Sequence, residues 1–132
     1  MATLYKNTRE YVDVDFAFTR HPTSDNVTIK RNVNAVKQAV INLLLLKEGD
    51  KPFHPEIKSP IYDFLFETTS VIVKIVLEGE VLKYLNRYEP RVEIQSVTIS
   101  FDSPNAISCS VTGEIINLQQ PFDVNILINR IR

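Results

Sequence analysis

Residues 92–128, VEIQSVTISFDSPNAISCSVTGEIINLQQPFDVNILI, decide the fold class of this chain. Apolar side chains recur at nearly every second position on both sides of the turn-forming stretch 102–105. A period of two is typical of strands that bury one face, and Asp, Ser, Pro and Asn favour a tight turn. We therefore predict an antiparallel hairpin, with Cys109 among its inward-facing side chains.

The strand that follows this hairpin is a candidate for an interaction. After a break at residues 117–121, apolar side chains again alternate with polar ones, and they are Phe122, Val124, Ile126 and Ile128. A strand late in a chain can lie at a sheet edge, where unpaired backbone groups accept a further strand. A strand that pairs wholly within its own sheet is the more common arrangement. The sequence leaves both alternatives open.

Helical periodicity precedes the sheet. Residues 28–46 place apolar side chains at spacings of three and four, which predicts a helix with one apolar stripe. Asp25 or Thr28 is placed to cap its start, and Gly49 to end it. The connection over residues 49–60 contains three prolines, so we expect a loop there.

A second long helix is predicted over residues 70–87, after a short helical turn at 61–67. Pro90 supplies its stop. We expect its core-facing stripe to be Val71, Ile75, Leu82 and Leu85. In the preceding loop, Phe53 is expected to anchor the chain on the body.

These elements predict an α+β fold: two main helices followed by a small antiparallel sheet with an exposed C-terminal edge strand. Near the N-terminus, alternating apolar residues predict either a half-buried strand or an extended arm on a partner; they are Val12, Val14, Phe16 and Phe18. We expect an N-terminal arm at residues 1–27 and a single α+β domain at 28–132.

Composition argues against several classes of protein. The 132 residues carry 15 Lys and Arg against 16 Asp and Glu, a net charge of −1, so a generic nucleic-acid binder is not expected. The single cysteine excludes an internal disulfide framework. No apolar run approaches the ~20 residues that span a bilayer, so no membrane span is expected.

Signals of catalysis are absent from the residue pattern. The carboxylates Glu67, Glu78, Glu80, Glu89 and Glu93 invite a lysozyme-like alternative that cleaves peptidoglycan. That chemistry needs two carboxyl groups about 5–10 Å apart across a cleft, one of them with a raised pKa. Nothing in the spacing indicates such a pair, and solvated helix faces are the common use of these residues. We expect no catalytic residue, no metal and no cofactor.

The tripeptide Glu89-Pro90-Arg91 lies between the second helix and the first strand of the sheet. Pro90 turns the chain out of the helix, and the charged residues flank the corner. Either charge could make a charge-assisted bond within the chain or to a neighbour. An intramolecular clamp and a knuckle that docks on a partner are equally compatible with the sequence.

Three motifs in this order and spacing resemble the baseplate wedge family of contractile-tailed phages, also called sheath initiators, and the related small subunit of type VI secretion baseplates. The likeness covers roughly residues 33–97, although Ile57-Lys58 stands where the family often has Phe-Gly. The motifs are Gly49-Asp50-Lys51-Pro52-Phe53, Leu65-Phe66-Glu67 and Tyr88-Glu89-Pro90-Arg91.

The resemblance implies a structural subunit, not an enzyme, in a six-fold baseplate of a virion tail that assembles in the host cytoplasm. Glu89, Pro90 and Arg91 would dock on a helical bundle of neighbouring wedge subunits near the tail tube. The strand over residues 122–128 would offer its edge to the first ring of sheath. Some family members are labelled lysozymes, a label that the carboxylates here do not support. A phage tail and a related secretion or injection machine remain equally open.

Overall fold

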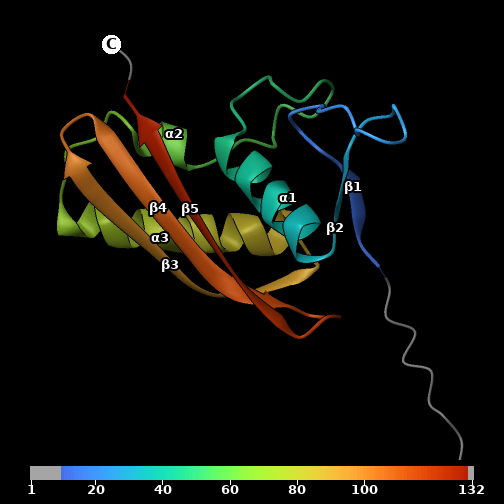
Figure 1. Cartoon of the computed structure of the whole chain (residues 1–132). Coiled ribbons are helices and arrows are strands. Elements are labelled where there is room, and N and C mark those ends of the chain that lie inside the picture. The colour runs from blue at the N-terminus through green and yellow to red at the C-terminus, as the bar shows by residue number, and fades with distance from the viewer. Residues whose placement is uncertain (1–9, 131–132) are drawn as a thin grey trace, which may run out of the picture.

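The computed structural model describes residues 10–130; residues 1–9 of the predicted arm and residues 131–132 of the predicted domain lie outside the described residues. The predicted α+β class is confirmed: along the chain, a small antiparallel sheet is followed by the helices and then by a larger antiparallel sheet (Figure 1). In chain order the elements are β1 (Val12–Val14), β2 (Ile29–Arg31), α1 (Val33–Leu45), α2 (Ile61–Phe64), α3 (Val71–Tyr88), β3 (Val92–Ser103), β4 (Ala106–Ile115) and β5 (Gln120–Asn129).

The larger sheet has the strand order β3-β4-β5, each pair antiparallel. The predicted hairpin is confirmed: Ser103 pairs with Ala106 around the turn at Pro104 and Asn105. β5 pairs with β4 from Ile115↔Gln120 to Ala106↔Asn129 without a break in register. In the described part of the chain β5 has β4 as its one strand neighbour, so the predicted C-terminal edge strand is confirmed.

An extra residue in β3 explains why the apolar positions of this strand change from even to odd residue numbers. Ile94 pairs with Gly113 and Ser96 with Thr112, which leaves Gln95 as an extra residue in the ladder. A bulge of this kind moves the following side chains to the opposite face. As a result, Val97 packs against the same core as Ile94 although the two are three residues apart.

The core lies on one face of the larger sheet. α3 packs against β3 and α1 packs against β5, and their buried side chains form one cluster with those of the strands. The prediction that Cys109 is a core residue is confirmed, and burial raises the pKa of its thiol to about 12. The opposite face is polar, with hydroxyl pairs such as Thr98↔Ser110 across β3 and β4. The sheet is therefore covered on one side, as expected for an antiparallel sheet.

The first predicted helix is too long at its start. Residues Ile29–Arg31 form β2, which pairs with β1, and α1 begins at Val33. Asn32, which directly precedes α1, has a φ of 49°; its N–H donates to Tyr11 O and its Oδ1 accepts from Tyr11 N. Neither Asp25 nor Thr28 therefore caps the helix. Tertiary pairing with β1 overrides the helical period here. Gly49 does not end α1 either, because the helix ends at Leu45.

The second predicted helix is confirmed within one residue at each end, and the Ser70 hydroxyl accepts a hydrogen bond from Val73 N at its start. The preceding helical turn, predicted to residue 67, ends at Phe64. The predicted stripe is wrong at Val71 and Ile75, which are exposed. Apart from Lys74, the first two turns of α3 are apolar all around, so periodicity could not select the buried face; the buried set is Leu77, Val81, Tyr84 and Leu85.

The loop between α1 and α2 is held by polar contacts and by the partly buried Ile57, and not by Phe53. The Phe53 ring is 97% exposed, at a φ of 66°, so its predicted role as an anchor is wrong. Ser59 is buried and its N–H donates to Leu46 O at 2.9 Å, while the Tyr62 hydroxyl donates to Leu45 O at 3.2 Å. These bonds secure the loop without an apolar anchor at its tip.

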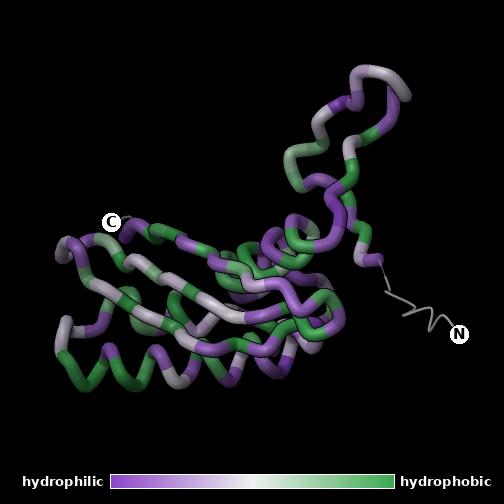
Figure 2. Tube along the Cα trace, turned by 60° about the horizontal axis from the view of Figure 1, so that its bottom comes forward, coloured by the Kyte–Doolittle hydropathy of each residue, from purple (hydrophilic) through white to green (hydrophobic). Residues whose placement is uncertain are grey.

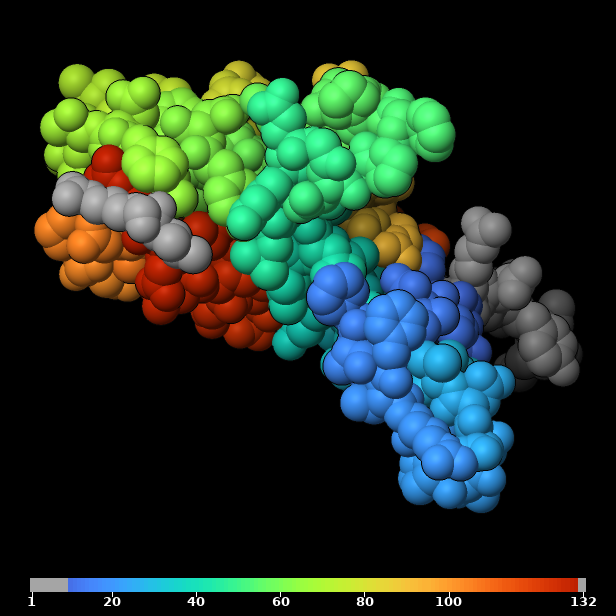
Figure 3. Space-filling view, turned by 90° about the horizontal axis from the view of Figure 1, so that it is seen from above, coloured from blue at the N-terminus to red at the C-terminus, as the bar shows by residue number. Residues whose placement is uncertain are grey.

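β1 and β2 form a separate hairpin that projects from the body (Figure 2). Its register joins Val12 to Arg31 and Val14 to Ile29. Seen from above, this hairpin and the start of α3 lie at opposite ends of an elongated molecule (Figure 3). Small two-stranded sheets are marginally stable alone, so the contacts at the base of this hairpin matter for its placement.

Candidate interaction surfaces

The Glu89-Pro90-Arg91 corner is built by the end of α3. The helix ends at Tyr88, and Glu89 N still donates to Leu85 O at 2.8 Å before the chain turns into β3. The Glu89 side chain is buried, at 4% exposure for the residue. Arg91 Nε lies 2.6 Å from Glu89 Oε1 and Arg91 Nη2 lies 2.7 Å from Oε2. This two-bond fork is the strong geometry for an arginine–carboxylate pair.

Arg91 also reaches the N-terminal arm. Its guanidinium lies 5.3 Å from the centroid of the Tyr11 ring, and the Tyr11 hydroxyl accepts a hydrogen bond from Asn117 Nδ2 at 2.6 Å. The hydrogen bond to Glu89 raises the pKa of Arg91. One cation thus joins the end of α3, the start of β3 and the segment before β1.

The corner therefore uses its carboxylate within the chain. Both Glu89 oxygens accept from Arg91, while Pro90 is exposed and the Arg91 side chain is 29% exposed. The intramolecular pair that the sequence left open exists. Docking through the remaining surface of Pro90 and Arg91 stays a prediction.

The edge of β5 is the second predicted surface. The side chains predicted to share one face do so, with Phe122, Val124 and Ile128 buried and Ile126 partly buried. Arg130 N donates to Asn105 O at 2.6 Å, and the β4–β5 register has no bulge. Because antiparallel residues alternate in direction, odd-numbered residues from 123 to 129 turn their backbone N–H and C=O away from β4.

Side chains mark the two ends of this open edge. Lys37 of α1 lies 3.8 Å from Asp123 at the beginning of β5. At the other end the Arg130 guanidinium lies 4.6 Å from the centroid of the Phe66 ring. By contrast, a side chain of α3 contacts the opposite edge strand, β3: Ile99 N donates a hydrogen bond to Glu78 Oε1 at 2.9 Å. Glu78, expected to be solvated, thus covers part of that edge.

An exposed apolar surface at the start of α3 was missed by sequence reasoning. It consists of Phe66, Val71, Ile72, Ile75 and Val76. A helix that packs one face on a sheet needs one apolar stripe, and residues 71–77 carry apolar side chains on every face except at Lys74. That excess is the signal that could have identified the surface.

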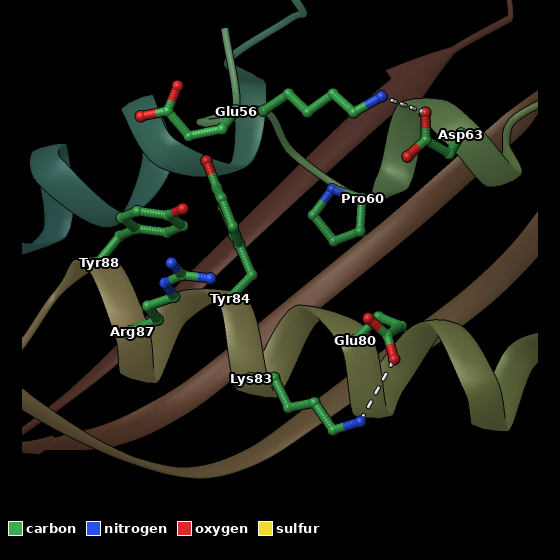
Figure 4. A pocket seen from close by; sticks show the side chains of 9 residues that line it. Glu56, Pro60, Asp63, Glu80, Lys83, Tyr84, Arg87 and Tyr88 are labelled. Carbon is green, nitrogen blue, oxygen red and sulfur yellow. Dashed lines mark hydrogen bonds and ion pairs between the residues drawn. The ribbon is translucent and has the colours of Figure 1, made fainter. Parts of the chain in front are cut away.

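A cavity of about 350 Å³ between α3 and the loop before α2 tests the lysozyme-like alternative (Figure 4). Three carboxylates line it, and two are paired: Asp63 with Lys58 and Glu80 with Lys83, each at 3.4 Å. A general acid for glycoside hydrolysis needs a raised pKa. Hydrogen bonding lowers the pKa of the third, Glu56. The cavity lacks the electrostatics of such a pair.

Residues 10–130 contain no group of three His, Cys, Asp or Glu side chains placed to hold a metal ion. None of the helices described in this range has the length and apolar character that crossing a bilayer requires.

No family model matches this chain. The baseplate wedge protein gp25 of Enterobacteria phage T4 is 24% identical over 89 residues, 67% of each chain. A putative tail lysozyme from Geobacter sulfurreducens has a TM-score of 0.66 at 19% identity, over 74% of this chain and 89% of its own.

A chain of the anti-feeding prophage baseplate, whose structure was symmetrised six-fold, has a TM-score of 0.64 at 17% identity. The match covers 93% of this chain and 88% of that one. At these identities both solved structures show a shared fold. The fold occurs both in a putative tail lysozyme and in an assembled baseplate, so the fold alone does not identify the function.

Proposed function

We infer from its relationship to the baseplate wedge family that this chain is a structural subunit of a contractile-tail baseplate. The resemblance predicted from three motifs is confirmed by the T4 wedge protein, which matches two thirds of each chain. This relationship carries the proposal. The fold shared with a chain of a solved baseplate supports it, as do the ion-paired carboxylates of the α3 cavity, which favour a role without catalysis.

The location of the protein tests this proposal directly. Particles purified from the source are separated into baseplate, sheath and tube fractions, and each is quantified by mass spectrometry. We expect this chain in the baseplate fraction at a fixed ratio to the other wedge subunits, six copies or a multiple per particle. A chain that stays free in the lysate would contradict a structural role in the baseplate.

We further propose that β5 starts sheath assembly by accepting a strand from the first ring of sheath. Support comes from the backbone groups of residues 125, 127 and 129, which face away from β4 between the Lys37–Asp123 pair and Arg130. Main-chain hydrogen bonds would supply the affinity in such a contact, and alternate side chains its register. The inward set Phe122, Val124, Ile126 and Ile128 holds the edge in place from the core side.

We propose, third, that the corner docks on a helical bundle of neighbouring wedge subunits. Pro90 and the free side of the Arg91 guanidinium form the contact, and Glu89 acts as a positioning residue because it orients Arg91. A guanidinium already held by a carboxylate loses less side-chain freedom on binding than a free one. Assembly would take place in the host cytoplasm, before the tail is complete.

A further inference from the structure

A tight turn after β1 displays two aromatic rings. Phe18 N donates to Asp15 O at 2.9 Å, and Phe18 has a φ of 51°. Asp15 is buried and accepts a hydrogen bond from the Thr19 hydroxyl at 2.8 Å, with Lys30 3.9 Å away. Although the turn is well bonded, Phe16 is 69% and Phe18 70% exposed. A strained, well-supported turn that exposes aromatic rings is typical of a binding surface.

The turn is attached to α1 by the side chain of Gln38. The Gln38 amide accepts from Phe16 N at 3.1 Å and donates to Val14 O at 2.8 Å. Both bonds fix the backbone on either side of Asp15 to the middle of the helix. Phe16 is consequently placed next to the end of α1 without being buried there.

Between this ring and the end of α1 lies an open hollow of about 370 Å³, which we call the Phe16 hollow. It is lined by Phe16, Asn42, Leu45, Leu46 and Asp50. Leu45 is 41% exposed, so an apolar side chain of the arm and one of α1 both face solvent in the hollow. Asp50 is the single charged residue among the five, and its carboxylate accepts from Lys47 N at 2.9 Å.

We propose that the Phe16 hollow binds an amphipathic helix of another baseplate subunit. The helix would place an apolar side chain between Phe16 and Leu45 and a Lys or Arg beside Asp50. Apolar walls with one acidic residue at the rim complement that pattern in shape and charge. This inference rests on the proposed function, since it takes the partner from the baseplate.

The fold shared with the solved baseplate chain includes part of the N-terminal arm. The match to the anti-feeding prophage chain covers 93% of this chain, more than residues 28–132 could supply, so it extends into the N-terminal arm. The arm is therefore part of the structure shared with a subunit in an assembled baseplate. The base of the arm contacts the Glu89-Pro90-Arg91 corner through Tyr11, but none of the five residues that line the Phe16 hollow belongs to that corner or to β5.

Photo-crosslinking in assembled particles tests the inference. p-Benzoylphenylalanine replaces Phe16 in the full chain, particles are irradiated, and crosslinked peptides are identified by mass spectrometry. We expect one dominant peptide from another baseplate subunit, with a Lys or Arg within one helical turn of the attached apolar residue. The same probe at Phe53, which is exposed but lies outside the hollow, should not give this peptide.

Two variants sharpen the result. Leu45→Ser should lower the crosslink yield about ten-fold, the size expected for an apolar anchor. Asp50→Asn keeps an acceptor for Lys47 N and should lower the yield several-fold at low salt and less at high salt. Thermal unfolding confirms that both variants fold.

A crosslink to sheath, to a second copy of this chain, or none at all would overturn the inference. Absence of the chain from the baseplate fraction would instead overturn the proposed function, so the two failures can be told apart.

Discussion

Glu89 Oε1 and Oε2 accept hydrogen bonds from Arg91 Nε and Nη2 at 2.6 and 2.7 Å across the exposed Pro90. The pair spans the point where α3 ends and β3 begins, and Arg91 continues to the Tyr11 ring. Any partner that contacts the corner therefore meets a guanidinium whose position is set inside the chain.

We expect Glu89→Gln to lower the free energy of unfolding of the isolated protein by about 1.5–3 kcal/mol, because a charged two-bond pair is lost at a buried position. Urea unfolding measures the change, and Glu93→Gln, at an exposed position, is the matched control. A loss below about 0.5 kcal/mol, the usual effect of a surface substitution, would show that the pair contributes little to folding.

Arg91→Lys separates docking from folding. Lysine keeps the charge, but it cannot form the two-bond fork and has no guanidinium to place over the Tyr11 ring. If the corner docks on wedge subunits, incorporation into baseplates should fall further than the loss in stability explains, as measured by mass spectrometry of particles. Incorporation that simply follows stability would argue against a docking role.

Leu127→Pro tests the β5 edge. Leu127 is exposed, and its N–H faces away from β4, so proline removes an outward donor and leaves the β4–β5 ladder intact. We expect folded protein that enters baseplates but starts few sheaths, counted by electron microscopy. Leu127→Ala, which keeps the N–H, should start sheaths normally. Sheathed tails of normal number with the proline variant would exclude strand addition at this residue.

Two glycines should respond to alanine in opposite ways. A Cβ on Gly113 would lie 2.4 Å from Glu93 O and 3.0 Å from Phe122 Cε1, so Gly113→Ala should cost about 1–3 kcal/mol of unfolding free energy. Gly79 lies inside α3 with nothing within 4 Å, so Gly79→Ala should stabilise the protein by about 0.5–1 kcal/mol. Thermal melts of both variants check the signs.

The buried hydroxyl of Tyr84 should make the folded protein less stable at alkaline pH. This hydroxyl donates to Leu43 O at 2.8 Å, and burial raises its pKa to about 12. The unfolded chain loses this proton near pH 10, so the contribution is complete below pH 10 and disappears as pH rises toward 12. Tyr84→Phe should cost about 1 kcal/mol at neutral pH, and this difference should shrink across that window. Urea unfolding between pH 7 and 11.5 measures it.

The strands of the larger sheet could be read from the sequence because their signals are local. Alternation over residues 122–128 and the turn residues at 102–105 depend on near neighbours, and Ser70 and Pro90 mark the limits of α3 in the same way. The bulge at Gln95 also has a local signal, because Ile94 and Val97 are three residues apart where a regular strand would place two inward residues an even number apart.

The contacts that join distant segments were decided by the tertiary structure. Ile29–Arg31 continue a helical pattern, yet pairing with β1 makes them a strand. The stack of Arg91 on Tyr11 joins residues 80 positions apart, and the Phe16 hollow needs Gln38 to hold a turn against α1. Periodicity shows which side chains share one face of a helix or strand, but not which other element packs against that face. Which residues become a clamp, an open edge or a hollow is therefore decided when the elements pack.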